Sequence, residues 1–160
     1  MIKKTFVKFF RKLFPKNVTD FPITFISNRF FVERANREPI LVVGDWQNTE
    51  YDSLRKRFDE VYSLDIFDNL KVAKGYFVKQ SVEDRLPFPD GFFKVVIMGA
   101  VIEQVWRNRD ALLELNRVLD PQGILLMSVQ FYRDNKFHYH SYSRTSFALL
   151  LKHSNFGLVE

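Results

Sequence analysis

Short runs of apolar residues recur from residue 39 onward and predict buried strands. Continuous apolar runs of four to eight residues are typical of strands that are covered on both faces of a sheet. The runs are ILVV (40–43), VYSLD (61–65), YFVK (76–79), KVVIM (94–98) and ILLMSVQF (124–131). We therefore expect a sheet whose strands are mostly central and buried.

Helical patterns lie between several of these strands. One is NTEYDSLRKRF (48–58), for which Asn48 or Thr49 would be the N-cap. Another is RDALLELNRVL (109–119), which the pair Asp120-Pro121 would end. Strands that alternate with helices predict a parallel sheet.

The last segment continues the same alternation. A helix is predicted from about Ser143, with a stop near Gly157, and GLVE (157–160) opens a sixth strand. The fold class predicted for residues 39–160 is therefore α/β, with a Rossmann-like, mostly parallel sheet that helices flank.

The N-terminal segment has a different pattern, in which apolar residues follow helical spacing and basic residues lie opposite them. The apolar positions are Ile2, Phe6, Phe9, Phe10, Leu13 and Phe14. Residues 1–38 are predicted to be a basic amphipathic helix, ended by Pro15, and a connecting segment. Such a helix either lies on an anionic membrane or packs against its own domain or a partner, and both alternatives stay open.

The distribution of charge separates this segment from the rest of the chain. The 160 residues carry a net charge of +5, yet residues 1–16 hold six basic and no acidic side chains. The remainder holds 18 basic and 19 acidic side chains, so its charge does not favour nucleic-acid binding. A partner or a membrane would be engaged through residues 1–16.

The absence of cysteine excludes disulfides, thiolate nucleophiles and cysteine metal sites. It fits a reducing compartment, so a cytoplasmic protein is expected, with peripheral membrane attachment as the alternative. No apolar run reaches the roughly 18 residues of a membrane-spanning helix.

The ends of the first two predicted strands carry candidate cofactor residues. Asp65 ends the second strand, 21 residues after Gly44, which is the spacing at which an acid binds a ribose diol. Asp45 and Glu50 place negative charge at the first loop, so a pyrophosphate is disfavoured there. A ligand with an ammonium and a sulfonium tolerates acids and aromatic rings, including Trp46.

Two longer stretches carry a resemblance to a known family. They are SVEDRLPFPDGFFKVVIMGAVIEQV (81–105) and LLELNRVLDPQGILLMSV (112–129). Together they resemble the second half of a class I S-adenosylmethionine (SAM) dependent methyltransferase of the broad small-molecule type. The matching positions are Leu86-Pro87-Phe88, Asp90-Gly91, Phe93, Glu103, Arg117-Val118-Leu119, Pro121 and Gly123.

The resemblance covers about residues 39–160 and implies SAM as the cofactor. It implies methyl transfer to a small-molecule or lipid-linked acceptor, on a core that is truncated at its C-terminus. Gly44 would be the first glycine of the cofactor loop, Asp65 would bind the ribose and Ile66 would flank the adenine. The cofactor-binding residues implied are Gly44, Asp45, Trp46, Asp65, Ile66, Ser81, Val82 and Glu83.

Several positions depart from the family pattern. A side chain in place of a glycine restricts the backbone and blocks its close approach to a ligand. The departures are Val42, Trp46, Asn48, Lys94, Gln104 and Gln122. They keep a second hypothesis open, a catalytically inactive methyltransferase-like module that binds a partner or membrane through its basic N-terminal helix.

Three residues are candidates for acid–base work on the acceptor: Glu103, His138 and His140. Aromatic residues expected near the acceptor are Trp106, Tyr132 and Tyr139. The H-x-H pair needs a third ligand to hold a metal, and the remaining histidine, His153, lies on the last predicted helix, so no metal site is predicted.

Overall fold

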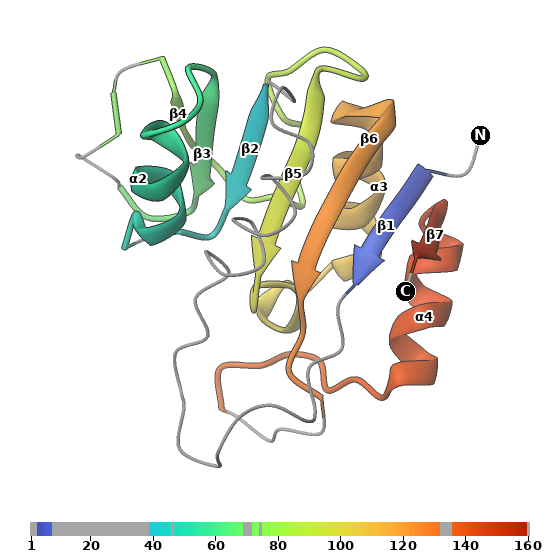
Figure 1. The fold of residues 1–160 in the computed structure, drawn as a ribbon. Helices are drawn as coiled ribbons and strands as arrows, with labels where there is room; N and C mark the ends of the chain where they lie inside the picture. The colour runs from blue at the N-terminus through green and yellow to red at the C-terminus, as the bar shows by residue number, and fades with distance from the viewer. Residues whose placement is uncertain are drawn as a thin grey trace.

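One parallel sheet organises the molecule in a computed structural model, which describes residues 3–7, 39–45, 47–68, 72–73, 75–131 and 136–159. The sheet has seven strands in the order β4-β3-β2-β5-β6-β1-β7, and every strand pair is parallel (Figure 1). The strands are β1 (Lys3–Val7), β2 (Ile40–Val43), β3 (Val61–Asp65), β4 (Phe77–Lys79), β5 (Phe93–Gly99), β6 (Leu119–Ser128) and β7 (Phe156–Val159).

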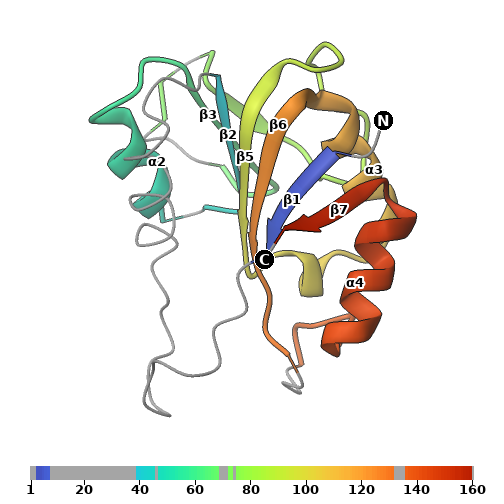
Figure 2. The same ribbon diagram turned by 45° about the vertical axis from the view of Figure 1, so that its right-hand side comes forward.

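Helices cover both faces of this sheet (Figures 1 and 2). The strands alternate their side chains between two apolar clusters. Ile40 and Val42 pack in the cluster that includes α2, whereas Leu41 and Val43 pack in the cluster that includes α3 and α4. The described helices are α2 (Thr49–Arg55), the 3₁₀ helix η1 (Ile102–Gln104), α3 (Asn108–Val118) and α4 (Arg144–His153).

The predicted fold class and the five predicted strands of residues 39–131 are confirmed. The largest difference in bounds is at β6, which starts at Leu119 rather than at residue 124. Pro121 therefore lies inside the strand instead of separating it from α3. The pairing of β5 with β6 shifts register between Phe93 and Val95, and such an irregularity is a position at which a strand tolerates proline.

The helix predicted at the N-terminus is wrong for Lys3–Val7, which form β1. This strand pairs with β6 through Thr5, Phe6 and Val7 and with β7 through Lys3 to Phe6. Ladders on two sides outweigh a local helical pattern, and β-branched and aromatic residues suit a pleated surface. Residues 8–38 lie outside the described residues, so the division of the chain at residue 38 and the role of residues 1–16 stay predictions.

The helix predicted from Ser143 is α4, and Ser143 is its N-cap. The Ser143 hydroxyl accepts from the Ser146 amide at 3.0 Å, and the Ser146 hydroxyl accepts from the Ser143 amide at 2.9 Å. This reciprocal pair is a capping box. The helix ends at His153, earlier than expected, and Gly157 already belongs to β7.

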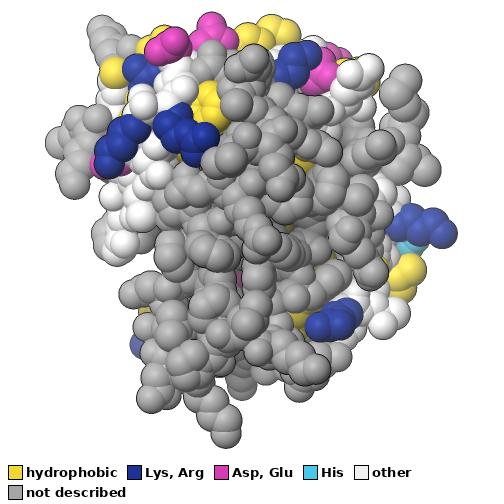
Figure 3. All heavy atoms as spheres, in the orientation of Figure 1, with side chains coloured by type: hydrophobic (Ala, Val, Ile, Leu, Met, Phe, Trp, Pro, Cys, Tyr) yellow, Lys and Arg dark blue, Asp and Glu magenta, His cyan; other side chains and the backbone are white. Residues whose placement is uncertain are grey.

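Charged side chains of both signs lie on the described surface. Figure 3 shows Lys and Arg side chains beside Asp and Glu side chains along the edge at which the strands begin. Among the described residues, no helix is long and apolar enough to cross a membrane.

Candidate functional site

Backbone hydrogen bonds tie together the carboxyl ends of β2, β3 and β4. The Gly44 amide donates to the Leu64 carbonyl at 2.9 Å, and the Gln80 amide donates to the Asp65 carbonyl at 2.9 Å. The loop after β2, the carboxylate that ends β3 and the segment after β4 are therefore neighbours. In a parallel sheet this edge is where ligands bind.

Gly44 has a conformation and surroundings that exclude a side chain. Its φ is +75°, and a Cβ at this position would clash with Cγ2 of Val101. The loop after β2 thus packs directly against the segment that follows β5. A glycine suits position 44 because the backbone there is left-handed and closely approaches Val101.

Asp45 caps α2. Its Oδ1 accepts from the Thr49 amide at 3.0 Å and its Oδ2 accepts from the Tyr51 amide at 2.8 Å. Burial raises the pKa of Asp45, and these backbone hydrogen bonds oppose the rise. Asn48 stands at the N-cap position with φ 59° and makes no side-chain cap bond. Trp46 lies outside the described residues.

Asp65 is buried at the tip of β3, and the two residues after it are exposed. Its Oδ1 accepts from the Phe67 amide at 3.0 Å, which holds the turn in place. Ile66 and Phe67 expose 57% and 64% of their surface. The tip therefore presents a fixed carboxylate beside two apolar side chains, which is the combination that a ribose and a flat base need.

The segment after β4 is attached to the start of α3. The Ser81 hydroxyl accepts from the Glu83 amide at 3.2 Å, and Glu83 Oε1 accepts from the Arg107 amide at 2.5 Å. Asp84 forms a salt bridge with Arg107 at 2.9 Å. The Val82 side chain is buried in the core, so only its backbone is left to face a ligand.

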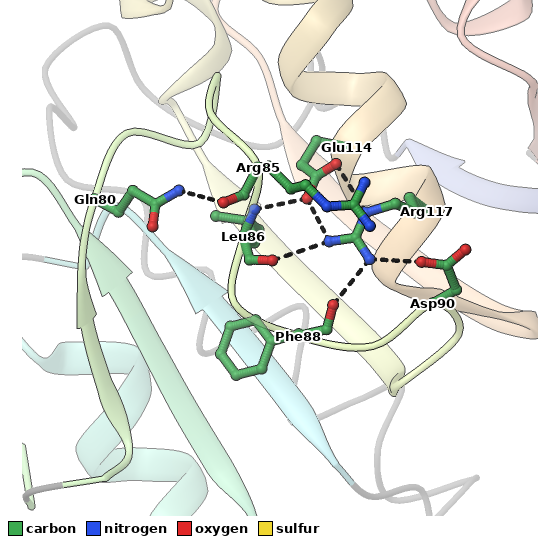
Figure 4. A network of polar contacts seen from close by, with 7 residues as sticks. All are labelled: Gln80, Arg85, Leu86, Phe88, Asp90, Glu114 and Arg117. Carbon is green, nitrogen blue, oxygen red and sulfur yellow. Dashed lines mark hydrogen bonds and ion pairs between the residues drawn. The ribbon is translucent and has the colours of Figure 1, made fainter.

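Arg117 and Glu114 anchor the next part of that segment (Figure 4). Arg117 donates to the carbonyls of Leu86 at 3.0 Å and Phe88 at 2.8 Å, and to Asp90 at 2.6 Å. Glu114 accepts from the Leu86 amide at 2.7 Å. Burial disfavours the Glu114 carboxylate, but hydrogen bonds from Arg117 and Leu86 outweigh it and lower the pKa of Glu114. The sequence matched Arg117, Leu86, Phe88 and Asp90 to a motif without indicating this role, and it did not single out Glu114.

Two departures from the family pattern have local partners. Lys94 forms a salt bridge with Asp120 at 2.5 Å, which joins β5 to β6. The Gln104 side chain donates to the Ala100 carbonyl at 3.0 Å and closes the turn before η1.

Glu103 joins η1 to the segment that follows β6. Its side chain is fully buried, and its Oε1 accepts from the Gln130 amide. Its carbonyl accepts from the amides of Tyr139 at 2.8 Å and His140 at 3.1 Å. Burial raises the pKa of Glu103, which the Gln130 amide and His138 oppose. The structure therefore brings Glu103 and the two candidate histidines together.

Aromatic side chains line the same region. The rings of Trp106 and Tyr139 meet edge to face with centroids 5.3 Å apart. They expose 67% and 62% of their surface. His140 Nε2 lies 2.9 Å from the Trp106 carbonyl. Tyr132 lies outside the described residues. Within the described part of the chain, no group of three or more possible metal ligands occurs.

A family match covers the segment that carries these tips. The methyltransferase domain family matches residues 43–127, more than half of the chain. The chain belongs to this methyltransferase family. The fold and the relatives place it among the class I SAM-dependent methyltransferases, whose cofactor is SAM. This confirms the family that the sequence resembles.

Two curated relatives are ubiquinone/menaquinone biosynthesis C-methyltransferases named UbiE. The protein of Stutzerimonas stutzeri (strain A1501) is 35% identical over 71 residues, which cover 44% of this chain and 28% of the relative. That of Azotobacter vinelandii (strain DJ / ATCC BAA-1303) is 32% identical over 108 residues, covering 60% of this chain and 43% of the relative. The chain thus spans less than half the length of either.

A solved methyltransferase has the same fold at low identity. It is the 1,6-didemethyltoxoflavin-N1-methyltransferase of Burkholderia thailandensis, with bound 1,6-didemethyltoxoflavin and S-adenosylhomocysteine. Its TM-score is 0.64 at 16% identity, and the match covers 85% of this chain and 68% of that one.

Proposed function

We propose that this methyltransferase domain binds SAM at the carboxyl ends of β2 to β5 and transfers its methyl group to a small-molecule or lipid-linked acceptor. One observation carries the proposal. Asp65 is a buried carboxylate with a fixed Oδ1, and it lies between the loop at Gly44 and the segment at Ser81.

The buried carboxylate and the exposed apolar side chains at this edge suit an adenosine with a positively charged sulfur. In the proposal Asp65 accepts from the ribose hydroxyls, and Ile66 and Phe67 pack on the adenine. The segment of Ser81, Val82 and Glu83 borders the base through its backbone, because its side chains are engaged in the core or with Arg107. When bound, SAM supplies an activated methyl group, so the protein chiefly aligns the reactants.

We infer an acceptor with a conjugated ring. Trp106 and Tyr139 offer exposed aromatic faces beside Glu103 and His138. The named relatives are C-methyltransferases of ubiquinone/menaquinone biosynthesis, and the solved neighbour contains 1,6-didemethyltoxoflavin. Both descriptions support a ring acceptor for this chain as a proposal.

The alternative, an inactive module that uses a basic N-terminal helix, loses part of its support. Lys3–Val7 form a strand inside the sheet and do not present a helical face. The alternative would be favoured if the protein failed to bind the cofactor.

Calorimetric titration with S-adenosylhomocysteine tests the proposal. Hydrogen bonds to a charged group contribute about 1.5–3 kcal/mol, so D65N should weaken binding roughly 10- to 100-fold. Asp68 is a matched control, because it is an exposed acid that pairs with Lys79 near the same tip. D68N should bind like the wild type. Absence of binding to the wild-type protein at millimolar ligand would refute the proposal.

A further inference from the structure

Two buried polar atoms near the proposed acceptor side lack hydrogen-bond partners among the described residues. They are Oε2 of Glu103 and Nδ1 of His138. Buried polar side-chain atoms are nearly always hydrogen-bonded, because desolvation without a partner is costly. The two atoms belong to segments that are already fixed against each other, so chance packing of a loose loop does not account for them.

The backbone fixes this geometry from both sides. Glu103 Oε1 accepts from the Gln130 amide, so one carboxylate oxygen is held and the other is left over. The Glu103 carbonyl accepts from the amides of the two residues that follow His138. The imidazole of His138 also lies close enough to stabilise the Glu103 carboxylate electrostatically.

The two histidines of the H-x-H pair have different surroundings. Nε2 of His140 lies 2.9 Å from the Trp106 carbonyl. A carbonyl only accepts, so this nitrogen carries a hydrogen, and His140 holds its segment against the turn between η1 and α3. In His138 the buried nitrogen without a hydrogen-bond partner among the described residues is Nδ1, and Nε2 is not among such atoms.

We propose that His138 accepts the proton that the methyl acceptor loses, and that Glu103 is the positioning residue that holds His138 in the tautomer with hydrogen on Nδ1. The assignment rests on the proposed methyl transfer. Glu103 Oε2 and His138 Nδ1 are not hydrogen-bonded in this structure. Catalytic hydrogen bonds are often long in free enzymes and tighten when the ligands bind.

For a quinol or phenol methylated on a ring carbon, the O–H proton passes to Nε2 of His138, and the buried carboxylate of Glu103 stabilises the imidazolium. The ring carbon forms a bond to the methyl carbon while the bond from methyl carbon to sulfur breaks, and that electron pair stays on sulfur. The proton on this ring carbon then moves to the oxygen, which restores the hydroxyl and the aromatic ring. The substrate class is therefore an acceptor that becomes nucleophilic by losing a proton, such as a phenol, an enol or a quinol. An amine with a free lone pair would not need this base.

Nitrogen-15 NMR of the histidine rings tests the pair directly. In E103Q the amide oxygen keeps the Gln130 contact, so the amide NH₂ takes the place of Oε2 and can only donate. We expect His138 to carry its neutral hydrogen on Nδ1 in the wild type and on Nε2 in E103Q. His140 should keep hydrogen on Nε2 in both proteins. The same tautomer of His138 in both would overturn the positioning role of Glu103.

Kinetics with a short-chain naphthoquinol that lacks the ring methyl group test the base. H138Q should lower kcat about 100- to 10,000-fold, the usual contribution of a general base, while KM for SAM and affinity for S-adenosylhomocysteine stay unchanged. His153, exposed on α4, supplies the control H153Q, which should match the wild type. Equal kcat in H138Q and the wild type would overturn the inference.

The two proposals fail in different ways. If the wild type does not bind S-adenosylhomocysteine, the proposed function fails, and the tautomer measurement on the free protein still decides the Glu103–His138 pair. If it binds but does not methylate the quinol, the protic-acceptor assignment is contradicted while the cofactor site stands.

Discussion

Arg117 and Glu114 lie one turn apart on α3 and form a salt bridge with 2.5 Å between Nη2 and Oε1. Their side chains are only 15% and 12% exposed. Together they bind the backbone of Leu86 and Phe88 in the segment that leads from β4 to β5. The position of Leu86 and Phe88, which follow the proposed cofactor segment in the chain, thus depends on this pair.

Removing Arg117 should destabilise the protein strongly. R117A leaves Glu114 with the Leu86 amide as a donor and removes the Arg117 donor from two carbonyls, and hydrogen bonds to a charged group contribute about 1.5–3 kcal/mol. R117K should recover only part of this, because lysine lacks the planar fork that reaches several acceptors. Urea denaturation measures both, with R109A on the exposed side of the same helix as the control. If R117A lowers the free energy of unfolding no more than R109A does, Arg117 does not stabilise the protein through these contacts.

Replacing Gly44 by alanine should lower the free energy of unfolding by more than the left-handed backbone conformation alone accounts for. A left-handed residue other than glycine costs about 1–2 kcal/mol, and G44A also drives a Cβ into Val101. Gly75 is the matched control, because its φ is +94° and a Cβ added there would have nothing within 4 Å. The free energy of unfolding should fall further in G44A than in G75A. In G44A/V101A the clash is relieved, so a smaller combined loss than the sum of the single variants is expected.

The buried carboxyl of Glu103 should make stability depend on pH. Burial raises its pKa above the ordinary 4.5, so the folded state holds this proton more tightly than the unfolded state. The stabilisation from protonated Glu103 is complete below pH 4.5 and is lost as pH rises through the folded pKa. E103Q stays neutral, so its unfolding free energy should gain on that of the wild type from about pH 4.5 upward.

Urea unfolding at a series of pH values checks this difference. Burial also raises the pKa of Asp45, but its effect on the unfolding free energy is the same in both proteins and cancels in their difference. Titratable groups that interact with Glu103 are His138 and Tyr142, so the comparison is repeated in an H138Q background. If the unfolding free energy of E103Q minus that of the protein with Glu103 falls with rising pH in both backgrounds, the raised pKa of Glu103 is refuted.

Ser143 should stabilise α4 through its capping box. S143A removes the acceptor of the Ser146 amide, and loss of an N-cap side chain costs about 1 kcal/mol. Ser141 is exposed two residues earlier and is the control. Thermal unfolding should show a lower Tm for S143A than for S141A, and equal Tm values would show that the cap is not stabilising.

The local patterns predicted most of the sheet, because buried strands leave apolar runs that are visible in the sequence. Residues 40–43 and 61–65 form strands with the predicted bounds. The N-terminal strand could not be predicted in this way. Its pairing partners, β6 and β7, are far along the chain, and parallel pairing leaves no local signal. Aromatic residues at helical spacing therefore suggested the wrong element.

The roles of the candidate site residues stay predictions, and the sequence located these residues better than it predicted their contacts. It pointed to Asp65 and Glu103, which are buried at the end of β3 and in η1 after β5. It did not predict that both oxygens of Asp45 cap α2, nor that Val82 turns into the core. Side-chain direction in turns depends on which amides are unpaired, and this follows only from the assembled backbone.

The order of the sheet also governs how the chain folds during synthesis. β1 is made before the other described strands, yet both of its neighbours, β6 and β7, are made near the other end of the described sequence. Contacts between such distant segments form slowly. We therefore expect Lys3–Val7 to insert late, and until then β7 lacks the one neighbour that it has among the described strands.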